Sequence, residues 1–308
     1  MLRKTLIIFS YDDGSLLLNP LHSALESNVD EIFLLYGGNA PYSEIAQITD
    51  SRLLKILESE RKGKSGALRS IIDDISGDIV FMVSGDVIFD PGIVSLCEGK
   101  FSQNVGAISV KVRPINTDRL TERAAEIMWN IHDFQLSLLS SIHKNVHGGE
   151  FVALRKEIIK DMPEVVNDDE YLCIKAAEMG REVLYIDDVE VRNFVPSNPF
   201  DLFQQRRRIN YGHIEIMKMG SDPMVMDSLF FTDPGTFIDI FSKFLKSRRW
   251  RLVPLVLSMA IETLSVASAR IDMIAKKDHR RWHIVKRSSF PEPKFEKGVN
   301  NISDKYKD

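Results

Sequence analysis

The chain contains few cysteines: Cys97 and Cys173 are the only two among 308 residues. Two cysteines are too few for a disulfide scaffold or for a cysteine-based zinc site. The sequence also lacks a charged-then-apolar leader with a small-residue cleavage site, because residues 5–9 already read as an apolar strand. Both absences predict a protein of the reducing cytoplasm.

Neither sign of charge dominates, since 40 Lys and Arg stand against 44 Asp and Glu. With an apolar fraction of 44%, this composition is ordinary for a globular protein and indicates no function. The charge is unevenly spread, because residues 243–288 hold twelve basic and three acidic residues, a net +9. A basic segment on an acidic body favours an anionic partner. Phospholipid headgroups are a more economical partner than nucleic acid, because aromatic residues do not interleave with the basic ones.

The length fits one α/β domain, predicted at residues 1–222, with an extension at 223–288 and a disordered tail at 289–308. Apolar strand-type runs alternate with helical patterns through the first half, which predicts a mostly parallel sheet covered by helices on both faces. The predicted strands are residues 5–9, 31–35, 79–83, 105–110 and 183–186. The predicted helices are residues 21–27, 67–75, 121–142, 168–179 and 200–219.

The extension contains a long apolar run at residues 252–269, nearly long enough to span a membrane. Polar residues recur in it every three or four positions, which places them along one helical stripe. Glu262 in the middle of the run favours a helix in the plane of a membrane surface over a spanning one. Alternatively, the stripe faces water while the other face packs on the first domain or on a second subunit, giving a homo-oligomer. The stripe consists of Ser258, Glu262, Ser265, Ser268, Asp272 and Lys276.

Two polar motifs carry the chemistry. Asn167-Asp168-Asp169-Glu170 opens a predicted helix, and Gln205-Arg206-Arg207-Arg208 begins thirty-six residues after Asp169. Carboxylates at a helix start and a basic helix downstream suit a reaction in which an acceptor hydroxyl is deprotonated while a diphosphate leaves. We predict Asp169 as the general base and Asp168 as a residue that orients its neighbours.

The second motif, residues 205–208, places a glutamine and an arginine on one face of a predicted helix. Gln205 and Arg208 are three residues apart, so they lie on one helical face and can reach the same diphosphate. Three consecutive arginines usually form a solvated or lipid-facing surface, which is the reading for Arg206 and Arg207. For the first motif the alternative is a plain helix cap formed by Asn167 or Asp168.

Together the two motifs resemble those of family 2 glycosyltransferases, which pair a Glu-Asp motif with a downstream Gln-x-x-Arg-Trp. The resemblance implies a GT-A fold and an inverting enzyme that moves a sugar from a nucleotide-diphosphate donor to a hydroxyl acceptor. Ile209 replaces the Trp that helps hold the acceptor in processive synthases, so the resemblance implies a non-processive enzyme. The basic extension suggests a lipid-linked or membrane-held acceptor and a peripheral position on the cytoplasmic membrane face.

The same resemblance implies a metal and phosphate site. Asp86 follows an apolar strand, where the family has an Asp-x-Asp element that binds a divalent metal, Mg²⁺ or Mn²⁺; Ser84 replaces the first Asp. One carboxylate, two phosphates and water can complete an octahedral shell. Lys64 belongs to a loop that opens a helix, a favourable place for phosphate. Taken alone, these segments read as a turn and as a solvated basic loop.

The remaining predicted positions flank the donor and the acceptor. Tyr11 can stack on the nucleobase and Asp12 can accept a hydrogen bond from it, although Asp12 also suits a turn. The acidic residue that the family has after the second strand is replaced by Tyr36-Gly37-Gly38, so the base stays open. The residues that align with the acceptor side are Trp129, His132, Gly149 and Glu150. His132 suits a buried hydrogen-bonded histidine equally well.

Two other functions remain as alternatives. A non-catalytic relative that binds a nucleotide sugar or a membrane is motivated by Ser84 and Ile209, which depart from the family pattern. A sugar nucleotidyltransferase would use a similar sheet and metal-bound phosphates. It would have a Gly-rich loop with an Arg after the first strand, where this chain has Tyr11-Asp12-Asp13-Gly14.

Overall fold

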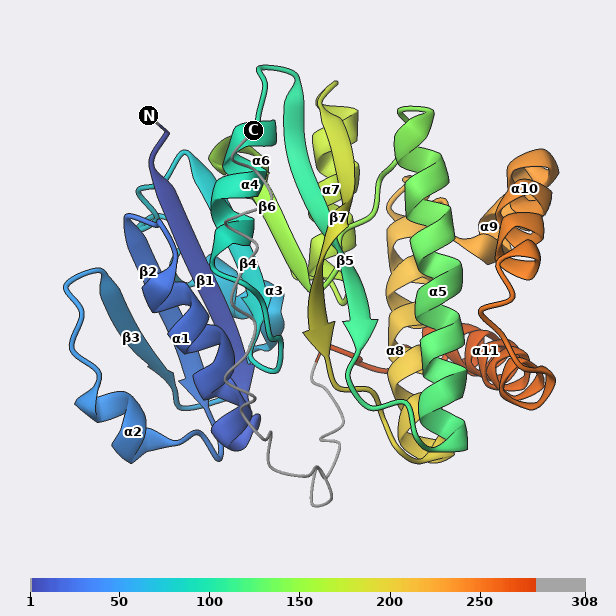
Figure 1. Cartoon of the computed structure of the whole chain (residues 1–308), viewed down its shortest axis with the longest axis horizontal. Helices are drawn as coiled ribbons and strands as arrows, with labels where there is room; N and C mark the ends of the chain where they lie inside the picture. The colour runs from blue at the N-terminus through green and yellow to red at the C-terminus, as the bar shows by residue number, and fades with distance from the viewer. Residues whose placement is uncertain (1, 281–308) are drawn as a thin grey trace.

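The computed structural model describes residues 2–280, so the predicted tail and the last part of the basic segment lie outside the described residues. Its centre is a seven-stranded sheet with the order β3-β2-β1-β4-β6-β5-β7 (Figure 1). Among the strands of residues 2–280, β6 alone runs antiparallel to its neighbours, which confirms the mostly parallel sheet. The strands are β1 (Lys4–Tyr11), β2 (Glu31–Gly37), β3 (Leu53–Glu58), β4 (Ile79–Ser84), β5 (Val105–Pro114), β6 (Phe151–Arg155) and β7 (Glu182–Asn193).

The central strands are apolar on both faces, as is usual for parallel strands covered by helices. Leu6 and Ile8 of β1 face one core, to which α1 (Leu18–Glu26) and α4 (Gly92–Lys100) contribute. The alternate residues Ile7 and Phe9 face the second core, with α3 (Gly63–Arg69), α6 (Lys156–Ile159) and α7 (Asp168–Glu178). Helices therefore cover both faces, as predicted. The short elements η1 (Gly14–Leu17) and α2 (Tyr42–Gln47) follow β1 and β2.

Two strands were not predicted, and a third is longer than predicted. β3 was missed because it is an edge strand with half-exposed side chains, so its sequence lacks an apolar run. β6 was missed because it is only five residues long and follows two glycines. β7 extends to Asn193, well beyond the predicted residues 183–186, because its second half is an edge that carries acidic residues. These edge and short strands are the parts of the sheet that apolar patterning does not mark.

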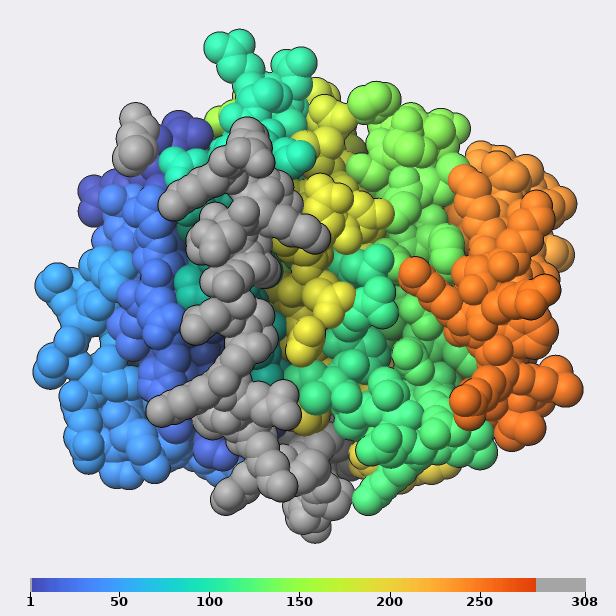
Figure 2. Space-filling view, viewed as in Figure 1, coloured from blue at the N-terminus to red at the C-terminus, as the bar shows by residue number. Residues whose placement is uncertain are grey.

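A layer of helices packs at the β5–β7 end of the sheet (Figure 1). It contains α5 (Leu120–Ser141), α8 (Pro199–Lys218), α9 (Met226–Thr232), α10 (Pro234–Lys246) and α11 (Leu252–Ile274). Ile261 of α11 shares a core cluster with Ala124 of α5 and Leu202 of α8, and Phe244 of α10 packs on Ile127 of α5. The extension thus packs on the first domain. In Figure 2 its atoms form the right-hand edge of the molecule.

Helix α11 packs with its polar stripe facing inward. Ser258, Ser265 and Asp272 are 3%, 0% and 0% exposed. Glu262 accepts from the Arg206 guanidinium of α8 at 2.7 and 2.8 Å, and Asp272 accepts from Arg207 at 2.5 and 2.6 Å. The alternative in which the stripe faces water is therefore wrong. So is a solvated or lipid-facing surface for these two arginines, because buried charges are stabilised by pairing.

The outward face of α11 is apolar. Seven of its aliphatic side chains are more than half exposed, namely Leu252, Val253, Val256, Met259, Leu264, Ile271 and Ile274. By length and composition α11 could cross a membrane, yet a third of its most apolar stretch is buried in the protein. An exposed apolar face of this size is unusual for a soluble surface and indicates an interaction site.

Candidate functional site

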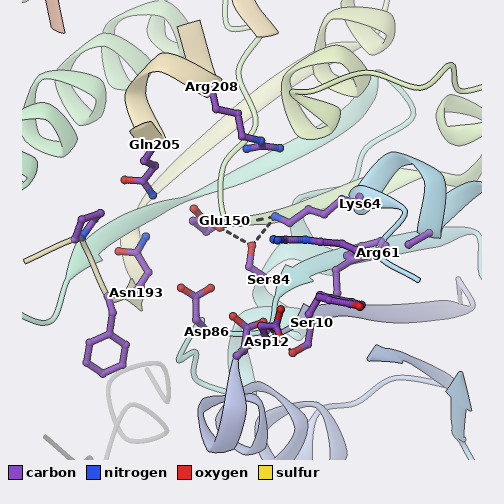
Figure 3. A pocket seen from close by; sticks show the side chains of 18 of the residues that line it. Ser10, Asp12, Arg61, Lys64, Ser84, Asp86, Glu150, Asn193, Gln205 and Arg208 are labelled. Carbon is purple, nitrogen blue, oxygen red and sulfur yellow. Dashed lines mark hydrogen bonds and ion pairs between the residues drawn. The ribbon is translucent and has the colours of Figure 1, made fainter. Parts of the chain in front are cut away.

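A pocket lies at the carboxyl ends of the parallel strands, the edge where α/β sheets present ligand-binding groups. Strand-end residues such as Ser10 and Asp86 lie on one side of it, and Gln205 and Arg208 face them from α8 (Figure 3). Of the residues predicted for the donor and metal, all line this pocket: Tyr11, Asp12, Lys64, Ser84, Asp86, Gln205 and Arg208.

A chain of three polar groups crosses the pocket floor. The Lys64 ammonium donates to Ser84 Oγ at 2.6 Å, and Ser84 Oγ donates to Glu150 Oε2 at 2.5 Å (Figure 3). Burial lowers the pKa of Lys64, but the carboxylates of Glu150, Asp168 and Asp169 outweigh burial and hold that pKa above its usual value. Lys64 is therefore a fixed positive charge. Glu150, predicted on the acceptor side, lies on the same floor as the donor residues.

Helix α8 supplies the opposite wall. It begins with Asn198, whose Oδ1 accepts from the Asp201 amide at 2.9 Å, followed by Pro199 in the first turn. Gln205 and Arg208 both line the pocket, as their spacing predicted. Burial lowers the pKa of Arg208 to about 10, while Asp168 and Asp169 oppose that effect. Arg208 thus stays positive at neutral pH and carries its charge on the pocket wall.

Asp168 and Asp169 begin α7, close to Val166, whose carbonyl accepts from the Arg208 guanidinium at 2.8 Å. Neither residue lines the pocket, but both act on the charges of Lys64 and Arg208. Burial and the neighbouring carboxylate of Asp168 raise the pKa of Asp169 to about 7, against the opposing effect of Lys64. A carboxylate with a pKa near 7 is suited to accept a proton at neutral pH.

The first turn of α7 is fixed against α8 by close contacts. A Cβ on Gly212 would lie 2.3 Å from Asn167 Cγ, and one on Gly148 would lie 2.7 Å from Asp169 Cβ. Asn167 does not cap α7 with its side chain; instead its amide donates to Glu170 at 2.9 Å and to the Ile209 carbonyl at 3.0 Å. These contacts hold Asp169 and the α8 wall in one arrangement.

A buried ion pair strengthens the same contact. His213 Nδ1 of α8 lies 2.8 Å from Glu170 Oε2. Burial raises the pKa of Glu170, but His213 reverses this and lowers it; burial lowers the pKa of His213, but Glu170 raises it above the usual value. Each group therefore favours the charged form of the other. The sequence offered no signal for this pair, because the two residues are forty-three positions apart.

Three predicted acceptor-side residues lie away from the pocket. His132 packs edge-on against Trp129 and His147, at centroid distances of 5.7 and 5.6 Å. Burial lowers the pKa of His132 to about 3, so its imidazole is neutral. Gly149 has room for a side chain. Gly148 has none, because its backbone packs closely against Asp169. None of these three residues, Trp129, His132 and Gly149, lines the pocket.

Asp12 adopts the turn that its alternative predicted. Its φ is +66°, and its Oδ1 accepts from the Asn39 amide at 3.0 Å, although the residue also lines the pocket. Several lining residues were missed by sequence reasoning, namely Ser10, Asp13, Glu58, Arg61 and Asn193. Glu58 and Asn193 end strands that were missed or shortened, so recognising those strand ends would have found them.

The donor set suits a magnesium-like ion held mainly by substrate. Within residues 2–280 no group of three or more His, Cys, Asp and Glu could hold a metal alone. Asp86 offers a carboxylate on the pocket rim, and Mg²⁺ characteristically takes one or two carboxylates together with substrate phosphates and water. Ser84 already bonds Lys64 and Glu150, so Asp86 is the fitting ligand.

Known proteins share both the sequence pattern and the fold of this chain. A sequence profile described as "Glycosyltransferase like family 2" matches residues 3–212. No curated protein sequence is similar enough to count as a relative. A solved mannosyltransferase from Pyrobaculum calidifontis, in complex with GDP-Man and Mn²⁺, superposes with a TM-score of 0.64 at 18% identity, over 90% of this chain and 88% of its own.

A second solved structure supports the same fold. Glucosyl-3-phosphoglycerate synthase from Mycobacterium tuberculosis, in complex with Mn²⁺, UDP and phosphoglyceric acid, superposes with a TM-score of 0.51 at 17% identity. The match covers 71% of this chain and 79% of that one. These likenesses establish the GT-A fold, and the profile covers more than half of the sequence. The chain belongs to the family 2 glycosyltransferases.

Proposed function

We propose that the protein is an inverting glycosyltransferase that uses a nucleotide-diphosphate sugar. The observation that carries the proposal is one pocket lined by Lys64, Arg208 and Asp86, with the carboxylate of Asp169 within electrostatic reach of both cations. Two cations and the carboxylate of Asp86 suit a diphosphate and its counter-ion, and a carboxylate of raised pKa suits a base. Two neighbours solved with nucleotides and Mn²⁺ support the same substrate class.

The reaction follows from these groups. The acceptor oxygen forms a bond to the anomeric carbon on the face opposite the diphosphate, while the bond from that carbon to the diphosphate oxygen breaks. Asp169 receives the proton of the acceptor hydroxyl, and Lys64 and Arg208 offset the negative charge that grows on the leaving diphosphate. A Mg²⁺ or Mn²⁺ ion held by Asp86 and the diphosphate would neutralise further charge. Displacement from the opposite face inverts the anomeric configuration.

The direct test is turnover of nucleotide sugars followed by proton NMR. With Mn²⁺ present we expect release of nucleoside diphosphate and a product of inverted anomeric configuration. Because one protein carboxylate holds the ion, excess EDTA should lower the rate about 100-fold or more, since the ion supplies several kcal/mol of charge stabilisation. A retained configuration would contradict the single displacement, and an EDTA-insensitive rate would contradict the role of Asp86.

We further propose that the apolar face of α11 lies on an anionic membrane surface and brings the enzyme to a lipid-linked acceptor. Exposed basic residues flank this face at both ends of the helix, which gives the charge complementarity that headgroups require. Helix α9, which packs on α10, exposes a further large apolar side chain, Phe231. The flanking basic residues are Lys243, Lys246, Arg248, Arg251, Arg270 and Lys276.

Vesicle flotation tests this docking. The triple change Val256→Ser, Leu264→Ser and Ile271→Ser removes apolar groups that are 57%, 60% and 65% exposed, so it should leave folding intact. We expect it to weaken binding to vesicles containing phosphatidylglycerol about tenfold or more, since each buried methylene contributes about 0.8 kcal/mol. Raised salt should weaken wild-type binding.

The matched control is Leu54→Ser, an exposed leucine on β3 at the other end of the molecule (Figure 1), which should bind as wild type does. Equal binding of the triple variant and the wild type would contradict membrane docking. A stable dimer that requires Val256, Leu264 and Ile271 in the absence of lipid would contradict it as well, and would assign the face to a second copy.

A further inference from the structure

Glu58, the last residue of β3, presents a carboxylate to the pocket that the proposed reaction does not use. Its Oε1 is buried and has no hydrogen-bond partner among residues 2–280. A buried carboxylate oxygen without a donor costs free energy, and buried polar groups in native proteins are nearly always satisfied. An orphaned acceptor on a pocket wall therefore points to a ligand that brings the donor.

The surroundings of Glu58 suit a flat ring. Tyr11, Gly37 and Glu58 are paired across the ends of β1, β2 and β3, so they point to the same face of the sheet. A Cβ on Gly37 would lie 2.7 Å from Tyr11 Cε2 and 2.7 Å from the Glu58 carbonyl oxygen. The Tyr11 ring thus lies across Gly37 and next to Glu58. An aromatic face beside a carboxylate can stack a base and bind its edge.

The charge on Glu58 decides which hydrogen-bonding edge of a nucleobase can bind there. Burial raises the pKa of Glu58 above its usual value, and the cations Lys62 and Arg61 oppose that shift in part by stabilising the carboxylate. An ionised carboxylate only accepts hydrogen bonds, and its two oxygens match two adjacent N–H donors. Arg61 also lies over the Tyr11 ring, 5.5 Å from its centroid, so the cation that supports the carboxylate borders the same space.

Guanine presents two adjacent donors, the ring N1–H and the exocyclic N2 amino group, on one edge. Uracil and thymine present a single ring N–H between two carbonyl oxygens, which a carboxylate would repel. Adenine and cytosine place a ring nitrogen acceptor beside their amino group. A carboxylate therefore gains two hydrogen bonds from guanine and at most one from each of the other bases.

We propose that Glu58 is a specificity-determining residue that binds the N1–H and N2 amino groups of guanine, so that the donor is a GDP-sugar. This inference rests on the proposed use of a nucleotide-diphosphate sugar. Glu58 takes the place of the acidic residue that the family has after β2, where this chain has Tyr36-Gly37-Gly38: its carboxylate comes from the neighbouring strand, at the position paired with Gly37.

Isothermal titration calorimetry of the full chain with GDP, IDP, UDP and ADP in the presence of Mn²⁺ tests this assignment. IDP differs from GDP only by the missing 2-amino group. We expect wild type to bind GDP about tenfold or more tighter than each of the others, the range of a good two-bond base contact. In the near-isosteric variant Glu58→Gln, affinity for GDP should fall about tenfold or more, and the preference for GDP over IDP should disappear.

The outcomes separate the two proposals. Tightest binding of UDP or ADP would overturn the guanine assignment and leave the glycosyltransferase proposal standing. The same holds if Glu58→Gln keeps the wild-type ratio of GDP to IDP affinity, because a purely structural residue would change both affinities equally. Absence of binding to all four nucleotides in folded wild type would contradict both proposals. Leu54→Ser, on the same strand but outside the pocket, should leave all four affinities unchanged.

Discussion

Replacing Asp169 by Asn should lower glycosyl transfer about 10²- to 10⁴-fold while donor affinity stays within about threefold. The amide matches the carboxylate in shape, so the contact with Gly148 is preserved. It cannot take a proton from the acceptor hydroxyl, which is the role that we assign to Asp169. The measurement is steady-state release of nucleoside diphosphate in the presence of acceptor, with donor affinity from calorimetry.

The matched control is Asp188→Asn, because Asp188 is an exposed aspartate on β7 outside the pocket. It should transfer sugar at the wild-type rate. If Asp169→Asn transfers sugar within about tenfold of wild type, well above the range expected for loss of a general base, another group must take the proton. If no donor is turned over by either protein although nucleotides bind, the non-catalytic alternative is favoured.

The second large effect is expected at Arg208. Replacement by Gln removes a charge from the pocket wall and should lower kcat about 10²- to 10³-fold, as for other preorganised groups that stabilise a growing negative charge. Substrate affinity should fall less, because the charge on the diphosphate grows as the sugar departs. Arg208→Lys should recover part of kcat, since lysine keeps the charge but loses the planar donor geometry. Separate measurements of kcat and KM distinguish these effects.

Arg206→Gln is the control on the same helix. Arg206 pairs with Glu262 of α11 and does not line the pocket. Its loss should lower thermal stability, because it leaves the half-buried carboxylate of Glu262 without its cation, and should change kcat less than about threefold. Equal losses of kcat in both variants would show that α8 acts only through its packing, and would contradict a direct role for Arg208.

The fold was largely predictable because its central strands are covered on both faces. Residues of β1, β2, β4 and β5 form continuous apolar runs, and buried parallel strands require such runs. β3 and the second half of β7 lie at the sheet edges, where half-exposed side chains give no such pattern. The orientation of α11 was not predictable, because its acidic residues pair with arginines from a helix more than fifty positions away.

The site was predictable where a motif carries its chemistry within a few residues. Arg208 was singled out by its spacing from Gln205, and Lys64 and Asp86 by the family resemblance, because their own segments read as a loop and a turn. The structure gathers all three in one pocket. Glu58 was missed because its strand was missed, and the Glu170–His213 pair because it joins two distant helices. His132 and Trp129 were assigned to the acceptor side by the family resemblance; both are half-buried, contact each other and do not line the pocket. Long-range contacts and edge strands therefore account for what sequence reasoning missed.

The pH dependence of the transfer rate tests the assignment of Asp169 most directly. Its pKa is raised to about 7, so the carboxylate that accepts the proton is populated above that pH and is lost below it. Lys64 and Arg208 stay protonated throughout this range. Wild-type kcat/KM, which reports the free enzyme, should therefore fall about tenfold per pH unit below 7, to about a hundredth at pH 5, and the residual kcat/KM of Asp169→Asn should show no such limb. A wild-type rate that is flat from pH 5 to pH 8, or the same limb in Asp169→Asn, would contradict the account.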